Sequence, residues 1–138
     1  MFHCFAVRED HRDYLRFLWF RDHDLKKDMI ECRMKVHVFG NSPSPAVAIY
    51  GLHRATKEGE LTHGADTYNF VKRDLYVDDG LRSFPTAAEA VDLLRRTQAS
   101  PAESNLRLHK IMSNSPLVLS AFPPEDCAKG VKDLDFDF

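Results

Sequence analysis

The sequence predicts an α+β fold with a mostly antiparallel sheet, helices packed on one face of that sheet, and the element order ββαββαβα. Three observations lead to this prediction. Residues 30–39 alternate apolar and polar side chains, which is typical of a half-covered strand. Residues 86–94 combine a helix-capping box with apolar residues at helical spacing. Asp-Asp-Gly at 78–80 lies between two short β-prone runs, as expected of a tight hairpin turn.

The first elements of the chain are expected to form a hairpin. The aromatic and apolar run at 14–20 predicts a strand buried on most sides, which pairs with 30–39 across a charged connection. One face of the second strand is apolar and consists of Cys32, Met34, Val36 and Val38. The polar face leaves two interpretations open, contact with a phosphate backbone or ordinary exposure to solvent.

A helix is expected after the break at Gly40. Ser44 is a natural N-cap and Pro45 fits the first helical position, so the helix should run from Pro45 to Ala55 or Thr56. The polar stretch 57–66 then predicts a loop.

The second half predicts another hairpin, two helices and one more strand. Short strands at 70–71 and 81–84 are expected to flank the Asp-Asp-Gly turn. The capping box at Thr86 starts a helix that should end by Ser100-Pro101, because the residue before a proline disfavours helical geometry. We expect a strand at 106–111, a short helix at 115–121 that Pro123-Pro124 terminates, and a poorly ordered tail at 123–138.

The composition is typical of one globular domain. The 138 residues are 43% hydrophobic and 29% charged, which allows a modest core. No apolar run approaches the ~20 residues of a membrane span, and the start of the chain lacks the features of a signal peptide. Three widely spaced cysteines indicate a reducing compartment. We therefore expect an intracellular protein of the cytoplasm or nucleus without a membrane partner. The net charge of −2 gives no global sign of nucleic-acid binding.

Asp78 and Asp79 have the clearest chemical implication. Two neighbouring carboxylates at a hairpin tip repel each other and raise each other's proton affinity unless a cation is present. Mg²⁺ prefers carboxylate oxygen and would relieve this repulsion. Taken alone, the two residues are equally well explained as an ordinary acidic turn.

Four stretches of the chain carry a resemblance to a known family. Met1-Phe2-His3 is similar to the end of a first catalytic motif, Asp-Ile-x-x-Met-Phe. Residues 39–45 are similar to a nucleotide-binding motif, Phe-Gly-x-x-x-Ser-Pro, that leads into a helix. Tyr76-Val77-Asp78-Asp79 matches a catalytic hairpin, and the lysine strand at 106–110 is followed by Ser-Asn-Ser. In this order the stretches resemble the palm of a reverse transcriptase, most similar to the polymerase of BEL/Pao-type retrotransposons.

The resemblance implies RNA-directed DNA polymerisation, a template-directed nucleotidyl transfer. In that family two Mg²⁺ ions, which Mn²⁺ can replace, are held about 3.5–4 Å apart. The partners would be an RNA or DNA template-primer and a deoxynucleoside triphosphate. By residue carry-over, Asp78 would be the main metal ligand of the hairpin and Asp79 a weaker one, both catalytic.

The resemblance also implies roles for five further residues. Tyr76 would support the turn near the primer terminus, and Phe2 would pack on the incoming sugar and exclude a 2′-hydroxyl. Gly40 would let the nucleotide approach the backbone beside Phe39. Lys110 would protonate the departing pyrophosphate. The residues themselves leave alternatives open, since Phe2 and Phe39 also fit core aromatics and Lys110 also fits a solvated strand lysine.

The resemblance covers residues 1–138 as a partial reverse transcriptase domain, a palm with part of the fingers and without thumb or RNase H. In the family pattern, the first metal-binding aspartate would lie before the position of Met1. A two-metal site without it loses a bridging ligand. We therefore expect the isolated chain to be inactive, as a fragment of a longer polyprotein or a transposon-derived remnant.

Other classes of function compete with this interpretation. The main alternative is a non-enzymatic, transposon-derived protein that binds nucleic acid or a protein partner, with self-association through apolar surface left exposed by truncation. An unrelated metalloprotein would need tetrahedral ligand spacing, which His3-Cys4, Cys32 with His37, and Cys127 do not provide. A serine hydrolase would need a nucleophile-elbow sequence, and we find none.

Overall fold

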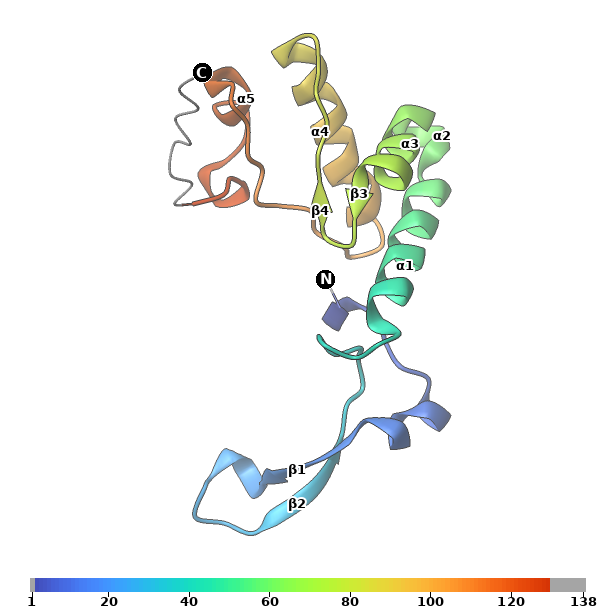
Figure 1. Ribbon diagram of the computed structural model, residues 1–138, viewed down its shortest axis with the longest axis vertical. Coiled ribbons are helices and arrows are strands. Elements are labelled where there is room, and N and C mark those ends of the chain that lie inside the picture. Colours follow the sequence, from blue (N-terminus) through green and yellow to red (C-terminus); the bar gives the residue numbers. More distant parts are fainter. Residues whose placement is uncertain (1, 130–138) are drawn as a thin grey trace. The chain divides into compact units, whose positions relative to one another are not determined.

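The computed structural model describes residues 2–129 and divides into two compact units, Met1–Gly51 and Leu52–Phe138 (Figure 1). The boundary between the units falls within helix α1. The strands are β1 (Arg16–Phe20), β2 (Met29–Arg33), β3 (Leu75–Tyr76) and β4 (Asp79–Gly80). The α-helices are α1 (Ser44–Glu58), α2 (Glu60–His63), α3 (Ala65–Asp74), α4 (Ala87–Ala102) and α5 (Pro116–Leu119).

The predicted mixture of helices and antiparallel strands is confirmed. The described residues form two separate two-stranded sheets, β1–β2 and β3–β4, where one sheet was predicted. Their order, ββαααββαα, differs from the predicted ββαββαβα. The difference arises because two segments predicted as loop or strand are helical and one predicted strand is irregular.

The first unit contains the predicted hairpin. Strands β1 and β2 pair antiparallel (Figure 1). Phe17 lies opposite Cys32 and Trp19 opposite Ile30. The predicted burial of the first strand is wrong, because Phe17 is 41% and Trp19 45% exposed. A sheet of two strands provides no third strand or second layer that would cover these side chains.

Both strands of this hairpin are shorter than predicted. Residues 14 and 15 belong to a 3₁₀ segment, Glu9–Leu15, that precedes β1. Beyond β2 the chain changes its pairing partner from β1 to residues 5–7. There Val36 forms an isolated bridge with Ala6, and the amide of His37 donates to the carbonyl of Phe5 at 2.9 Å. The predicted alternation of exposure is confirmed along β2, where every second residue is less exposed.

Helix α1 is close to the predicted helix. It begins at Ser44, one residue before the predicted start at Pro45, and continues two residues beyond Thr56. Ser44 is buried, and its hydroxyl lies 3.2 Å from the His37 ring nitrogen Nδ1. Gly51 is required by packing, since a Cβ there would overlap the ring of Phe5.

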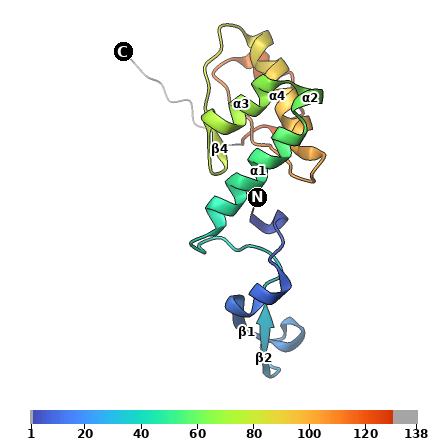
Figure 2. The same ribbon diagram turned by 90° about the vertical axis from the view of Figure 1, so that its right-hand side faces the viewer.

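The second unit packs α2, α3 and α4 side by side (Figures 1 and 2). The predicted loop at 57–66 is wrong: it contains the last residues of α1, all of α2 and the start of α3. The predicted strand at 70–71 is also wrong, because both residues lie in α3. The buried residues of α3 are Thr67, Phe70 and Val71, whose i, i+3, i+4 spacing forms one helical face.

Helix α4 begins as the capping box predicts. The Thr86 hydroxyl accepts a hydrogen bond from the Glu89 amide at 3.3 Å and lies 3.1 Å from the Glu89 carboxylate. The predicted end at Ser100-Pro101 is too early, because α4 continues to Ala102 with Pro101 in its last turn. The Pro101 carbonyl then accepts the amides of Ser104 and Leu106, which closes the helix.

The last described segment forms a small core against α4. Val118 and Phe122 are buried with Ala90, and Ile111 and Cys127 pack at the edge. The predicted strand at 106–111 is wrong except for Ile111, which makes a single parallel bridge to Cys127. Lys110 has φ 65°, and this left-handed backbone interrupts an extended chain. The predicted short helix is confirmed as α5, while the predicted tail lies partly outside the described residues, beyond Lys129.

Candidate metal-binding hairpin

The β3–β4 hairpin carries both acidic residues of the predicted site. Leu75 pairs with Gly80 and Tyr76 with Asp79, which leaves Val77 and Asp78 as a two-residue turn. A hairpin is therefore present at the two acids, but it consists of other strands than the predicted ones at 70–71 and 81–84, and its turn is Val-Asp where Asp-Asp-Gly was predicted. The predicted strand at 81–84 is wrong, because these residues are irregular and β4 ends at Gly80.

The hairpin is attached directly to the core of the second unit. Helix α3 leads into β3 without a loop. A Cβ at Gly80 would lie 2.9 Å from the Leu75 side chain and 3.4 Å from the Phe70 ring, so the glycine allows both to pack against β4. The Leu81 amide donates to the Asp74 carbonyl at 3.0 Å, and Arg82 forms an ion pair with the Asp74 carboxylate at 3.3 Å. These contacts hold the hairpin in a fixed orientation relative to the end of α3.

Asp78, Asp79 and Tyr76 are all exposed at this turn. Asp78 is in the turn and Asp79 is the first residue of β4. Tyr76 is 82% exposed and lies opposite Asp79. The two carboxylates are thus accessible to a cation from solvent.

Val77 gives the turn an unusual backbone. Its φ of 58° is left-handed, a conformation that a β-branched residue adopts only at a cost of about 1–3 kcal/mol. A positive φ at the first turn position is usual for glycine in two-residue hairpins. Backbone strain of this kind is concentrated at functional sites, where surrounding structure maintains it.

The donor set of the hairpin fits Mg²⁺ in type. Mg²⁺ is commonly bound by one or two carboxylates together with substrate phosphates and water, rather than by a complete cage of protein ligands. Asp78 and Asp79 are such carboxylates. Across residues 2–129, no group of three or more His, Cys, Asp or Glu side chains could hold a metal ion. A firmly held ion at this hairpin therefore needs phosphate or a further carboxylate from outside these residues.

The other predicted site residues lie in both units. Phe2 is buried and meets Phe39 edge to face, with ring centroids 5.8 Å apart, whereas Phe39 itself is 84% exposed. Gly40 has φ 84°, and a Cβ at this position would meet no heavy atom within 4 Å, so open space surrounds it. Lys110, in the second unit, is exposed on an irregular segment. The structure thus brings Phe2 and Phe39 together and groups Tyr76, Asp78 and Asp79.

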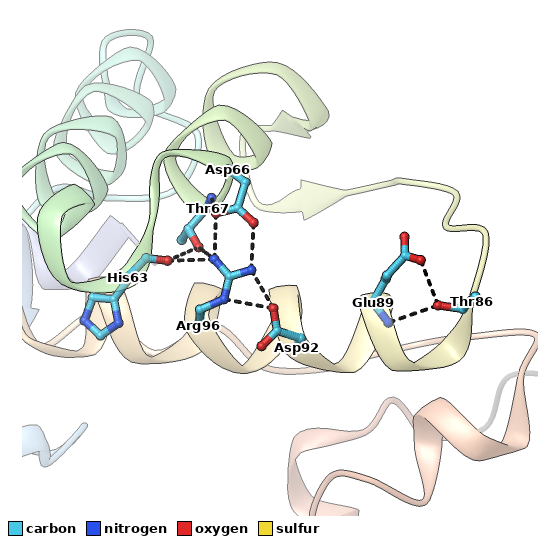
Figure 3. Close-up of polar contacts among 7 residues, drawn as sticks. All are labelled: His63, Asp66, Thr67, Thr86, Glu89, Asp92 and Arg96. Atoms are coloured by element: carbon cyan, nitrogen blue, oxygen red, sulfur yellow. Dashed lines mark hydrogen bonds and ion pairs between the residues drawn. The ribbon is translucent and has the colours of Figure 1, made fainter.

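Arg96 is the centre of a polar cluster in the second unit that the sequence patterns did not predict (Figure 3). Its guanidinium binds both oxygens of Asp66 at 2.6 and 2.7 Å, and Asp92 at 2.6 and 3.0 Å. It also donates to the His63 carbonyl at 2.8 Å and to the Thr67 hydroxyl at 3.2 Å. These bonds connect α4 to the end of α2 and the start of α3, the helix that leads into β3.

The electrostatics of this cluster follow from the same contacts. Hydrogen bonds from Arg96 lower the pKa of Asp66 below its ordinary value, against a smaller opposing effect of burial. The hydrogen bonds that Arg96 donates to Asp66, and then those to Asp92, raise the pKa of Arg96. The i, i+4 spacing of Asp92 and Arg96 was the one signal in the sequence, but it does not reveal the longer-range partner Asp66.

No family model, curated protein or solved structure matches the chain. Between residues 2 and 129, none of the helices combines the length and apolar character needed to cross a membrane.

Proposed function

We propose that the chain is a palm segment of a reverse transcriptase whose β3–β4 hairpin presents Asp78 and Asp79 to Mg²⁺. The observation that carries the proposal is the exposed pair of carboxylates on a strained two-residue hairpin, at the Tyr-x-Asp-Asp match. A second feature supports it: α1 begins at Ser44, within the Phe-Gly-x-x-x-Ser-Pro match that leads into a helix in the family.

In this proposal the residues of the hairpin bind the metal ions and set the direction of the turn. When bound, two Mg²⁺ ions activate the primer hydroxyl and stabilise the triphosphate with its leaving group. Asp78 and Asp79 hold the ions, Val77 and Gly80 fix the direction of the turn, and Tyr76 supports it near the primer end. Lys110, which is in the same unit as the hairpin, supplies a proton to pyrophosphate.

We propose further that this polypeptide alone does not polymerise. Two carboxylates bind a metal pair weakly, and losing a ligand at a developing charge costs several kcal/mol of transition-state stabilisation. Primer positioning also requires surfaces beyond this hairpin. The chain would act only when a further carboxylate completes the site.

Metal binding at the hairpin is tested by Mn²⁺, which broadens NMR signals of nearby nuclei. Low Mn²⁺ with a deoxynucleoside triphosphate is expected to broaden the amide signals of residues 76–80 first, and Asp78→Asn should abolish this selectivity. Asp28→Asn, which removes an exposed acid from the connection between β1 and β2, is the matched control and should change nothing at 76–80. Equal broadening at 76–80 in wild type and Asp78→Asn would refute the metal assignment.

Activity is tested by extension of a template-primer with Mg²⁺ or Mn²⁺. We expect no incorporation of nucleotides by the purified chain. Incorporation that depends on Asp78 would overturn the proposed inactivity while supporting the polymerase chemistry. Incorporation that persists in Asp78→Asn would instead indicate a contaminating enzyme.

A second candidate function is non-enzymatic binding through the β1–β2 hairpin. The observation that favours it is the exposure of Phe17 and Trp19 on one face and of Leu18, at 63%, on the other. Aromatic side chains on such a surface stack on unpaired bases in single-strand binding proteins. Salt-dependent binding of labelled single-stranded or primer-template nucleic acid would support this role. Absence of binding at low salt, combined with concentration-dependent dimerisation, would indicate self-association.

A further inference from the structure

Trp19 and His23 form a side-chain contact at the end of the β1–β2 hairpin. The indole Nε1 lies 2.9 Å from the imidazole Nδ1. Trp19 is the last residue but one of β1, and His23 follows in the connection to β2. Both side chains are exposed, so protons from solvent reach the imidazole directly.

The chemistry of the contact fixes the protonation state of His23. An indole N–H donates a hydrogen bond and cannot accept one. The imidazole Nδ1 must therefore accept through its lone pair, which requires the neutral ring with its proton on Nε2. In the imidazolium both nitrogens carry hydrogen, and the two N–H groups would oppose each other. The contact therefore exists only while His23 is neutral.

The contact holds a connection whose backbone is otherwise unfavourable. Asp22 and His23 have φ of 55° and 61°, two consecutive left-handed residues. A left-handed backbone is sterically unfavourable for residues other than glycine. Two other side-chain contacts hold the connection: Lys27 Nζ lies 2.9 Å from the Asp22 carboxylate, and the Lys26 amide donates to the Asp24 carboxylate at 3.0 Å. Backbone hydrogen bonds from the amides of Arg21, Asp24 and Lys27 to the carbonyls of Asp28, Arg21 and Asp24 also close it.

We propose that Trp19 and His23 form a pH-sensitive latch on the β1–β2 connection. The latch is closed when the imidazole is neutral and opens when it gains a proton. The proton comes from solvent, to which the imidazole is exposed. The charged residues of the connection itself are Arg21, Asp22, Asp24, Lys26, Lys27 and Asp28. On the paired strands, Arg16, Glu31 and Arg33 form ion pairs with one another or with Asp13, and Arg16 and Arg33 lie opposite each other at the end of the hairpin away from the connection.

The test uses intrinsic fluorescence, because Trp19 is the one tryptophan of the chain. Wild type is expected to show a one-proton step in emission as the pH falls. The step should be lost in His23→Gln, whose amide oxygen accepts the indole N–H at every pH. His11→Gln, at an exposed histidine that lies against Tyr14 rather than Trp19, should retain it. A step that survives in His23→Gln, or wild-type emission that is flat with pH, would overturn the proposal.

Two further measurements do not use fluorescence emission, and the first of them uses wild-type protein alone. In wild-type protein, the NMR signal of the indole N–H and those of the His23 ring should titrate at the same pH; different midpoints would contradict the latch. At one fixed neutral pH, amides of residues 22–24 should exchange with deuterium about fivefold faster in His23→Ala than in His23→Gln, the fold-change expected for loss of a single hydrogen bond. Equal exchange rates in these two variants would show that the Trp19–His23 hydrogen bond does not stabilise the backbone of residues 22–24.

Discussion

Val77 concentrates the backbone strain of the candidate metal site in one residue. Because asparagine tolerates a left-handed backbone, Val77→Asn should relieve much of the cost of about 1–3 kcal/mol at this position, and we expect the free energy of unfolding to rise by about 1 kcal/mol. Val77→Gly should gain less, since glycine also increases the entropy of the unfolded chain. Thermal or urea unfolding measures both.

The control for this prediction is Val47→Asn. Val47 lies in α1 with helical geometry, so there is no left-handed strain to relieve and the same substitution should destabilise the protein. If Val77→Asn also destabilises, packing of the half-buried Val77 side chain outweighs the strain of its backbone.

Loss of Arg96 should destabilise the packing of α4 against α2 and α3. Arg96→Met removes two ion pairs and two further hydrogen bonds at a half-buried guanidinium, and we expect a loss of about 1–3 kcal/mol in the free energy of unfolding. Arg82→Met removes one exposed pair with Asp74 and should cost less than about 0.5 kcal/mol. Equal losses in the two variants would contradict a structural role for the Arg96 cluster.

The Arg96 cluster also predicts a pH dependence of stability. The folded-state pKa of Asp66 is lowered by Arg96, so the stabilisation is complete above the ordinary carboxyl pKa of about 3.9 and is lost as pH falls through the lower folded value. Arg96→Met should remove this part of the acid sensitivity. Urea unfolding of both proteins at several acidic pH values tests it, and the difference between them should shrink as the pH decreases. A difference that stays constant would rule out the linkage.

Among the elements, α4 depends most clearly on a local start signal. Thr86→Ala removes the hydroxyl that accepts the Glu89 amide and should lower stability by about 1 kcal/mol. Thr86→Ser keeps the hydroxyl and should remain near wild type. Chemical unfolding followed by circular dichroism measures the two variants. If both lose the same stability, the methyl group rather than the cap is responsible.

Elements with such local signals could be predicted from the sequence, and elements that depend on distant partners could not. The starts of α1 and α4 follow from Ser44-Pro45 and from the Thr86 capping box, which act within one turn. The stretch 57–66 has the glycines and polar residues of a loop, and 70–71 has the β-prone residues of a strand, whereas the helical face of α3 is completed by packing against α4. The segment 106–111 has strand-like alternation but meets a partner only at Ile111.

The same distinction applies to the candidate site. The acidic hairpin was predictable because turn chemistry at 76–80 is local. The exact residues of the turn were not predictable, because no local rule places a β-branched residue such as Val77 at a positive φ. Arg96 was missed because Asp66 lies in another helix, and sequence spacing carries no information about that contact.

The whole molecule contains two units with very different amounts of buried surface. In the first unit the buried residues within 2–51 are Phe2, Val7, Ser44 and Ala48. The second unit buries most of the remaining apolar core, from Leu52 to Phe122. Because apolar burial is the main source of stability, the first unit should open at a lower free energy than the second.

This difference can be measured with two signals that report on different units. Emission of Trp19 follows the first unit, and far-ultraviolet circular dichroism is dominated by the helices of the second. We expect the fluorescence transition in urea to precede the circular dichroism transition, because the units do not unfold as one cooperative body. A Trp19→Phe, Tyr68→Trp double variant moves the fluorophore into α3, and its emission should then follow the circular dichroism. Coincident transitions in wild type would show instead that the sparse core of the first unit is held at the full stability of the second.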